Sequence, residues 1–222
     1  MKEVAILAGG PWKLVPPFNS KELKRCEWVG VDRGLYYLIK AGIRPVRAFG
    51  DFDSISESER LQIEKEHIDL TIYPAEKDAT DMELAVDWVI EQQPERCYIL
   101  GATGGRMDHG LLNIQLLYKG LHTGTEFIII DKQNQITLLK PGSYDVIRQE
   151  KFPYISFVPF SKKITGINLN GFKYSLEKAE LFLGSSLCIS NELIQPKGTI
   201  SFDDGLLLMI KSCDQDSQKI GL

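Results

Sequence analysis

The chain has 222 residues, of which 43% are hydrophobic and 25% are charged, and its formal net charge is −4. This composition is typical of a globular protein and excludes disorder, collagen and coiled coil. The acidic balance argues against nucleic acid as a partner, and the apolar runs are too short to cross a membrane. The four cysteines form no C-x-x-C pair, so we expect free thiols in a cytoplasmic protein.

The first part of the chain alternates between short apolar runs and helical patterns. The apolar runs predict buried strands at 4–8, 28–31, 47–49, 68–73, 97–100 and 127–130. The helical patterns lie at 34–41, 56–66, 80–92 and 107–119, and the second and third open with the capping boxes Ser56-x-x-Glu59 and Thr80-x-x-Glu83. Continuous apolar strands alternating with helices predict a largely parallel, doubly wound α/β sheet.

After about residue 135 the pattern changes to short segments separated by Gly, Asn, Pro or Asp. Strands are predicted at 143–148, 154–159, 164–169, 186–190, 199–202 and 206–211. This spacing predicts an all-β sandwich or barrel. We therefore predict two domains, an α/β domain over 1–135 and a β domain over 136–222.

Polar or glycine clusters follow several of the predicted parallel strands, which is where open α/β sheets bind their ligands. Asp51 and Asp53 are two residues apart, so in an extended chain both carboxylates point the same way. Asp78 and Asp81 flank a helix start, whose dipole tolerates negative charge. If these carboxylates and Asp32 meet at one sheet edge, their repulsion calls for a hard cation such as Mg²⁺. Each pair taken alone is equally consistent with turn formation or helix capping.

A glycine-rich segment, Gly101 to Gly105, follows a buried strand and precedes a helix. In that setting bare backbone N–H groups can cradle phosphate, and Arg106 adds a fork suited to phosphate oxygens. The segment is neither a Walker loop nor G-x-G-x-x-G. Asp108 could equally cap the helix, and His109 could lie on its surface.

Together these features predict a Mg²⁺-dependent enzyme that transfers a phosphoryl or pyrophosphoryl group from a nucleotide or other polyphosphate. Two alternatives stay open. Asp51-x-Asp53 is also the D-x-D metal signature of nucleotide-sugar glycosyltransferases, and a non-catalytic nucleotide-sensing module is the second alternative. The three tryptophans are expected mainly in the core, although Trp12, just after Gly9-Gly10, could line a pocket.

Five motifs follow one another over nearly the whole chain. They are VDRG at 31–34, GDFDS at 50–54, KDATDMELA at 77–85, GATGGRMDH at 101–109 with Asn113, and SNE at 190–192. This ordered set resembles the bacterial form of thiamine pyrophosphokinase. This sequence differs from the family pattern at Arg33, where many relatives carry a second glycine.

The resemblance implies a nucleotide- and metal-binding catalytic α/β domain and a β-sandwich that binds thiamine and dimerises. It implies a homodimer whose active sites lie between subunits. The implied reaction converts ATP and thiamine to AMP and thiamine diphosphate, by attack of the thiamine hydroxyethyl oxygen on the β-phosphorus of ATP.

The resemblance also implies roles for individual residues. Catalytic aspartates would be Asp51, Asp53, Asp78 and Asp81; of these, Asp51, Asp53 and Asp81 would bind Mg²⁺, with Asp32 and Asp78 near the metal or its waters. The ATP side would comprise Asp32, Arg33, Thr103, Gly104, Gly105, Arg106, Asp108, His109 and Asn113. Ser190 and Asn191 resemble thiamine-side residues contributed across the dimer, and their alternative interpretation is an ordinary strand-to-loop turn. Either Asp53 or Asp78 could accept the proton of the attacking hydroxyl, and the alternative is that positioning alone suffices without a dedicated base.

Overall fold

The structure is a computed structural model that describes residues 2–50, 70–72 and 78–214. It divides into two compact units, Met1–Lys132 and Gln133–Leu222, close to the predicted boundary. Asp51, Asp53 and the helix predicted at 56–66 lie outside the described residues. Within the described residues, no helix is both long and apolar enough to cross a membrane.

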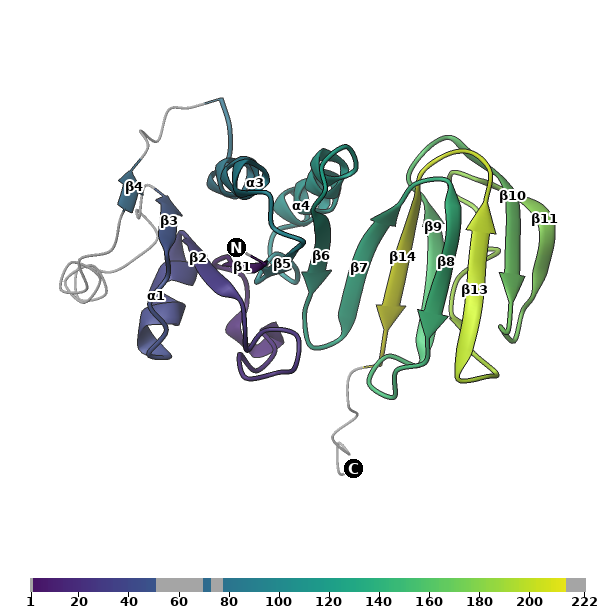
Figure 1. The fold of residues 1–222 in the computed structure, drawn as a ribbon, viewed down its shortest axis with the longest axis horizontal. Helices are drawn as coiled ribbons and strands as arrows, with labels where there is room; N and C mark the ends of the chain where they lie inside the picture. Colours follow the sequence, from purple (N-terminus) through teal and green to yellow (C-terminus); the bar gives the residue numbers. More distant parts are fainter. Residues whose placement is uncertain (1, 51–69, 73–77, 215–222) are drawn as a thin grey trace. The chain divides into compact units, whose positions relative to one another are not determined.

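The first unit is built on a parallel sheet (Figure 1). Its described strands are β1 (Glu3–Leu7), β2 (Glu27–Val31), β3 (Arg47–Gly50), β4 (Leu70–Ile72), β5 (Arg96–Leu100) and β6 (Glu126–Ile130). Their order across the sheet is β6-β5-β1-β2-β3-β4, and every neighbouring pair is parallel. The chain thus winds outward from β1 to β4 and then crosses back to continue on the other side of β1. This confirms the doubly wound prediction and places the topological switch point between β1 and β5.

The strands are covered on both faces. In β1, β2, β5 and β6 only the first residue is not buried, which requires cover on both sides because successive side chains alternate in direction. Figure 1 shows α1 (Arg33–Lys40) on one side of the sheet and α3 (Asp81–Gln92) and α4 (Met107–Gly120) on the other. The core beneath α1 joins Leu38 of that helix to Leu7 and Leu100 of the strands.

Helices α3 and α4 form where the sequence predicts them. The Thr80 hydroxyl accepts the Glu83 backbone N–H at 3.2 Å, so the predicted capping residue does begin α3. The two helices are joined by Lys119, whose ammonium lies 2.8 Å from both Glu83 and Asp87. Burial lowers the pKa of Lys119, but its hydrogen bonds to Asp87 and Glu83 outweigh this and leave the pKa raised.

Helix α1 approaches the end of β1 closely because Gly34 has no side chain. A Cβ added at Gly34 would lie 1.9 Å from the carbonyl oxygen of Leu7, far inside van der Waals contact. The same holds on the strand side, where a Cβ at Gly30 would lie 2.7 Å from the Cα of Leu35. These contacts set the position of the first turn of α1, which carries Asp32 and Arg33.

The second unit is an antiparallel β-sandwich, as predicted (Figure 1). Its strands are β7 (Asn134–Leu139), β8 (Gly142–Ile147), β9 (Tyr154–Pro159), β10 (Lys163–Asn170), β11 (Leu176–Phe182), β12 (Asn191–Glu192), β13 (Lys197–Phe202) and β14 (Leu207–Ser212). One sheet has the order β12-β9-β14-β7 and the other β11-β10-β13-β8. Phe157 and Leu207 of the first sheet share one core with Ile167 and Phe202 of the second.

The predicted strand at 186–190 is wrong, because this segment consists of turns. Gly184 has φ 85° and Ser190 has φ 54°, so the backbone reverses direction on either side of the apolar residues that suggested a strand. Strands β7, β11 and β12 are additions to the prediction. β11 escaped it because most of its side chains are not buried, so it lacks a clear apolar pattern.

Replacing Gly34 by alanine should destabilise the protein by ~1–3 kcal/mol, because the new methyl group must displace the Leu7 carbonyl or α1 itself. The measurement is the urea midpoint followed by circular dichroism. Gly110→Ala is the matched control: its Cβ meets no atom within 4 Å, and alanine is favoured in a helix by about 1 kcal/mol. A Gly34→Ala variant as stable as the wild type would contradict the close contact.

Candidate functional site

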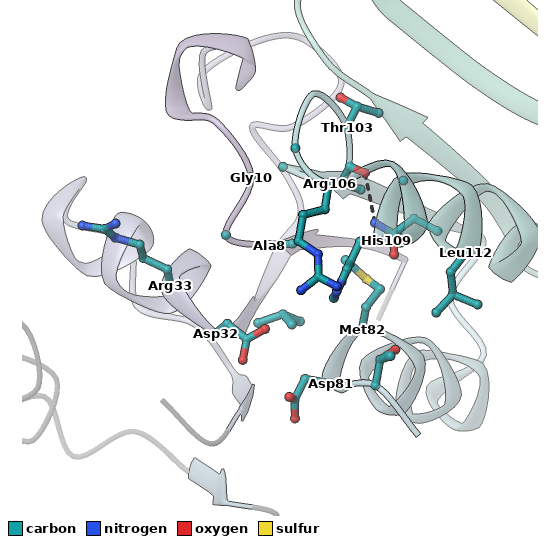
Figure 2. Close-up of a pocket in the computed structure, with 18 of the residues that line it drawn as sticks. Ala8, Gly10, Asp32, Arg33, Asp81, Met82, Thr103, Arg106, His109 and Leu112 are labelled. Atoms are coloured by element: carbon teal, nitrogen blue, oxygen red, sulfur yellow. Dashed lines mark hydrogen bonds between the residues drawn. The ribbon is translucent and has the colours of Figure 1, made fainter. Parts of the chain in front are cut away.

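A cavity of about 720 Å³ lies in the first unit, at the carboxyl ends of β1, β2 and β5 (Figure 2). Its walls come from the turns after these strands and from the first turns of α1, α3 and α4. The lining residues are 8–10, 31–33, 78–82, 101–103, 105, 106, 109, 110, 112 and 113. This is the switch point of the sheet, where doubly wound proteins bind nucleotides.

Bare backbone forms the wall between β1 and β5. The Gly10 N–H donates to the Gly101 carbonyl at 2.9 Å, which extends the strand pairing past the end of the sheet. A Cβ at Gly10 would lie 2.3 Å from that carbonyl oxygen, and Gly101 has φ 64°. Side chains are excluded from this wall, so a ligand meets main-chain groups there.

The glycine-rich segment is held in place by two side-chain hydrogen bonds. The buried Asn113 amide, on α4, donates to the Ala102 carbonyl at 3.0 Å. The Thr103 hydroxyl donates to the carboxylate of Asp131 at 2.6 Å, the short distance expected of a charge-assisted bond. Asp131 is only 3% exposed and follows β6 directly. These two bonds hold the segment against α4 and the end of β6.

Arg106 stands at the N-terminus of α4 and pairs with Asp108. Its Nε donates to Asp108 Oδ1 at 3.2 Å and its Nη2 to Oδ2 at 2.5 Å. The hydrogen bond from Arg106, with a further one from the His109 N–H, lowers the pKa of Asp108. Both partners are exposed, so the guanidinium can exchange Asp108 for a phosphate at low cost.

Three aspartates line the same cavity, namely Asp32, Asp78 and Asp81. Figure 2 shows the carboxylates of Asp32 and Asp81 facing the same part of it. Asp32 has φ 51°, a conformation that costs energy in a residue with a side chain and that is most common at functional sites. Gly50, at the end of β3, lies against it: a Cβ there would be 2.8 Å from Asp32 Oδ1.

In the second unit, Ser190 ends a turn and Asn191 begins β12, where it pairs with Ile155 of β9. Asn191 is 1% exposed, and its amide group is paired with the Tyr174 backbone: Oδ1 accepts at 3.0 Å and Nδ2 donates at 2.8 Å. The Ser190 N–H donates to the Ser156 hydroxyl at 2.9 Å. Exposed apolar side chains stand close to this turn in the chain, namely Leu187, Ile189 and Ile194.

Comparison with known proteins places both units in one family. Residues 20–129 match the family model described as "Thiamin pyrophosphokinase, catalytic domain", and residues 143–207 match "Thiamin pyrophosphokinase, vitamin B1 binding domain". The chain is 53% identical over 214 residues to thiamine pyrophosphokinase from Bacillus subtilis, covering 96% of this chain and 100% of that protein. The chain belongs to the thiamine pyrophosphokinase family.

Solved structures of the family agree with the fold. The crystal structure of the Bacillus subtilis thiamine pyrophosphokinase superposes with a TM-score of 0.91 at 50% identity, over 96% of this chain and 100% of that one. The crystal structure of the thiamin pyrophosphokinase from Geobacillus thermodenitrificans superposes with a TM-score of 0.88 at 44% identity, over 96% of this chain and 99% of that one. The predicted family, fold and pyrophosphokinase activity are confirmed, and these matches favour the kinase over the glycosyltransferase and the sensing module.

Most residues that the family resemblance singled out in the first unit do meet at the cavity. These are Asp32, Arg33, Asp78, Asp81, Thr103, Gly105, Arg106, His109 and Asn113. Gly104, in the glycine-rich segment, and Asp108, in the first turn of α4, do not line the cavity. Asp51 and Asp53 lie outside the described residues, and Ser190 and Asn191 belong to the second unit.

Sequence reasoning missed part of the cavity wall. Ala8 at the end of β1, Met82 and Leu112 line it, and none of them carries a polar group that would mark a site. Asp131 was also missed, although its position directly after a buried strand matched that of the other polar clusters. Its role emerges only from the contact with Thr103.

Thr103→Val should raise the KM for ATP about tenfold or more, because it removes a hydrogen bond to a carboxylate that holds the glycine-rich segment. Steady-state kinetics with varied ATP would measure this. Thr103→Ser keeps the hydroxyl and should stay near the wild-type value. If the valine variant uses ATP as well as the wild type does, this bond does not position the segment.

Proposed function

We propose that this cavity holds the triphosphate of ATP and is where the pyrophosphoryl group passes to thiamine. The hydroxyethyl oxygen of thiamine attacks the β-phosphorus, and the bond from that phosphorus to the oxygen bridging the α-phosphorus breaks. AMP leaves, and the hydroxyl proton is released. The observation that carries this proposal is a single cavity at the switch point with a glycine-rich segment and Arg106 on one side and aspartates on the other.

The phosphate side of the cavity is supplied by the main chain and Arg106. Bare N–H groups around Gly105 and the N-terminus of α4 favour anions, and a guanidinium fork matches phosphate oxygens. The pairing of Arg106 with a carboxylate at 2.5 Å supports this, because a carboxylate presents two oxygens as a phosphate does. The segment around Gly105 and Arg106 would hold the nucleotide tail in place for attack.

The aspartates would hold Mg²⁺. Among the residues that the structure describes, no three His, Cys, Asp or Glu side chains are close enough to bind one metal ion. Mg²⁺ does not need three, since it usually takes one or two carboxylates together with phosphate oxygens and water. The oxygen donors of Asp81 and Asp32 fit that requirement, and Asp51 and Asp53 would complete the set. When bound, Mg²⁺ neutralises charge on the phosphates of ATP.

The proton of the thiamine hydroxyl needs an acceptor as attack proceeds. Asp78 lines the cavity and stands before the N-cap of α3, so its carboxylate is one candidate, with Asp53 as the other. The acidic side also attracts thiamine, which carries a fixed positive charge. The reaction takes place in the cytoplasm, in keeping with four free cysteines.

Thiamine would reach the site from the second unit of a partner subunit, so that the active enzyme is a homodimer with sites between subunits. Support comes from the turn at Ser190, where exposed Leu187 and Ile194 offer an apolar surface. Because the amide of Asn191 is already paired with the Tyr174 backbone, Asn191 would act by shaping this turn, which leaves Ser190 to contact thiamine.

The reaction itself is tested by incubating the protein with ATP, Mg²⁺ and thiamine and measuring AMP and thiamine diphosphate. Equal amounts of both products are expected, with the yield lost on chelation of the metal. Release of a nucleotide from a sugar nucleotide would support the glycosyltransferase instead. ATP binding without turnover would support the sensing module.

Asp81→Asn should abolish turnover, by a factor of about a hundred or more, while leaving the fold intact, because the amide cannot replace the charge of a metal ligand. Product formation and circular dichroism together measure this. Asp87→Asn, on the same helix but outside the cavity, is the matched control and should retain activity. Unchanged turnover in Asp81→Asn would remove Asp81 from the metal site.

The shared active site can be tested by mixing two inactive variants. Asp81→Asn disables the first unit, and Ser190→Arg should disable thiamine binding by size and by repulsion of the cation. If sites form between subunits, a random mixture of refolded chains should recover about a quarter of wild-type activity, since half of the dimers carry one intact site. A mixture that stays inactive would place both groups in the same subunit.

A further inference from the structure

Trp12 is an exposed aromatic side chain that has no part in the reaction proposed above. It opens a short helix, η1 (Trp12–Leu14), directly after the turn that ends β1. Its side chain is 48% exposed, whereas Trp28 is 7% exposed and belongs to the core. Trp12 is thus the exception that the sequence allowed for among the tryptophans, although it is not among the residues that line the cavity.

One side of the Trp12 indole is held by other rings. Its centroid lies 4.9 Å from that of Tyr37, at a tilt of 47°, and 5.7 Å from that of Phe18, edge to face. Phe18 in turn packs on the buried Trp28 at 4.8 Å. These contacts restrain the indole while about half of its surface faces solvent, so little entropy is lost when a second flat group covers it.

Residues on either side of Trp12 in the chain lie at or near the cavity. Gly10, two residues before Trp12, lines the cavity, and so does Arg33, whose guanidinium lies 5.9 Å from the centroid of the Tyr37 ring. On the far side of η1, Leu14 lies against the glycine-rich segment: a Cβ at Gly104 would be 2.2 Å from its Cδ1. Trp12 itself is not among the lining residues, but it lies between Gly10, which lines the cavity, and Leu14, which packs on Gly104 of the glycine-rich segment.

We propose that the exposed face of Trp12 stacks on the base of the bound nucleotide, an inference that rests on the proposed function of the cavity. The phosphates occupy the polar interior, so the base extends to the rim, where it needs an apolar flat partner. The apolar residues across the cavity, Met82 and Leu112, are less suited to stack on a base. Met82 is only 6% exposed, and neither residue has a ring. In Figure 2 these two side chains lie across from Gly10 and Arg33.

This role has a specific chemical consequence. Stacking uses the π-face that every base has, so Trp12 adds affinity for a nucleotide without choosing among bases. It contributes nothing to a polyphosphate that has no base. Trp12 would therefore help the site to distinguish ATP from inorganic tripolyphosphate.

The test compares the dissociation constants of Mg²⁺–ATP and Mg²⁺–tripolyphosphate by calorimetry. Trp12→Ala should raise the dissociation constant of Mg²⁺–ATP about tenfold and leave that of Mg²⁺–tripolyphosphate unchanged. Trp12→Phe keeps a ring, so both constants should stay close to those of the wild type. Tyr118→Ala is the matched control, because Tyr118 is also 48% exposed but lies near the other end of α4. The inference would be overturned if Trp12→Ala weakened the binding of both ligands equally, or if it weakened the binding of neither.

Tryptophan emission of the intact protein gives a second measurement that needs no destabilising change. ATP should quench the tryptophan emission of the wild-type protein, and tripolyphosphate should not. In Trp12→Phe, ATP should no longer quench the emission. Quenching that persists in Trp12→Phe would also overturn the inference. If the wild-type protein neither binds ATP nor forms AMP, the proposed function itself is refuted. If Trp12→Ala binds ATP as the wild type does, only the stacking inference is refuted.

Discussion

The close approach of bare backbone at the ends of β1 and β5 is the constraint on which the site depends. Gly10 packs on the carbonyl of Gly101, and Gly34 packs on the carbonyl of Leu7, at distances that no side chain permits. These contacts bring the turn after β1, the first turn of α1 and the glycine-rich segment to one point. The cavity exists because three turns converge where the winding of the sheet reverses.

The cavity lining carries both signs of charge. Arg33, Arg106 and backbone N–H groups attract anions, and Asp32, Asp78 and Asp81 attract cations. Such an arrangement suits a substrate pair in which one molecule is a polyphosphate and the other carries positive charge. Asp108 pairs with Arg106, so the guanidinium does not face the site uncompensated.

Local pattern was sufficient for most of the fold. Continuous apolar strands alternating with helices predicted the parallel sheet, and Thr80 does cap α3 as its capping box indicated. The segment 186–190 shows where local pattern fails: its apolar residues suggested a strand, but positive φ values at Gly184 and Ser190 make it a pair of turns. Apolar content alone does not reveal the direction of the backbone.

The sequence by itself determined the family, the two-domain order and the set of polar residues that converge at the switch point, because these follow from motif order and from strand and helix periodicity. Only the tertiary structure decided what each side chain does there. It paired Thr103 with Asp131, paired the Asn191 amide with the Tyr174 backbone and left the Trp12 indole about half exposed. Such contacts join residues distant in the chain, and their geometry depends on how the turns pack, which periodicity along the chain does not encode.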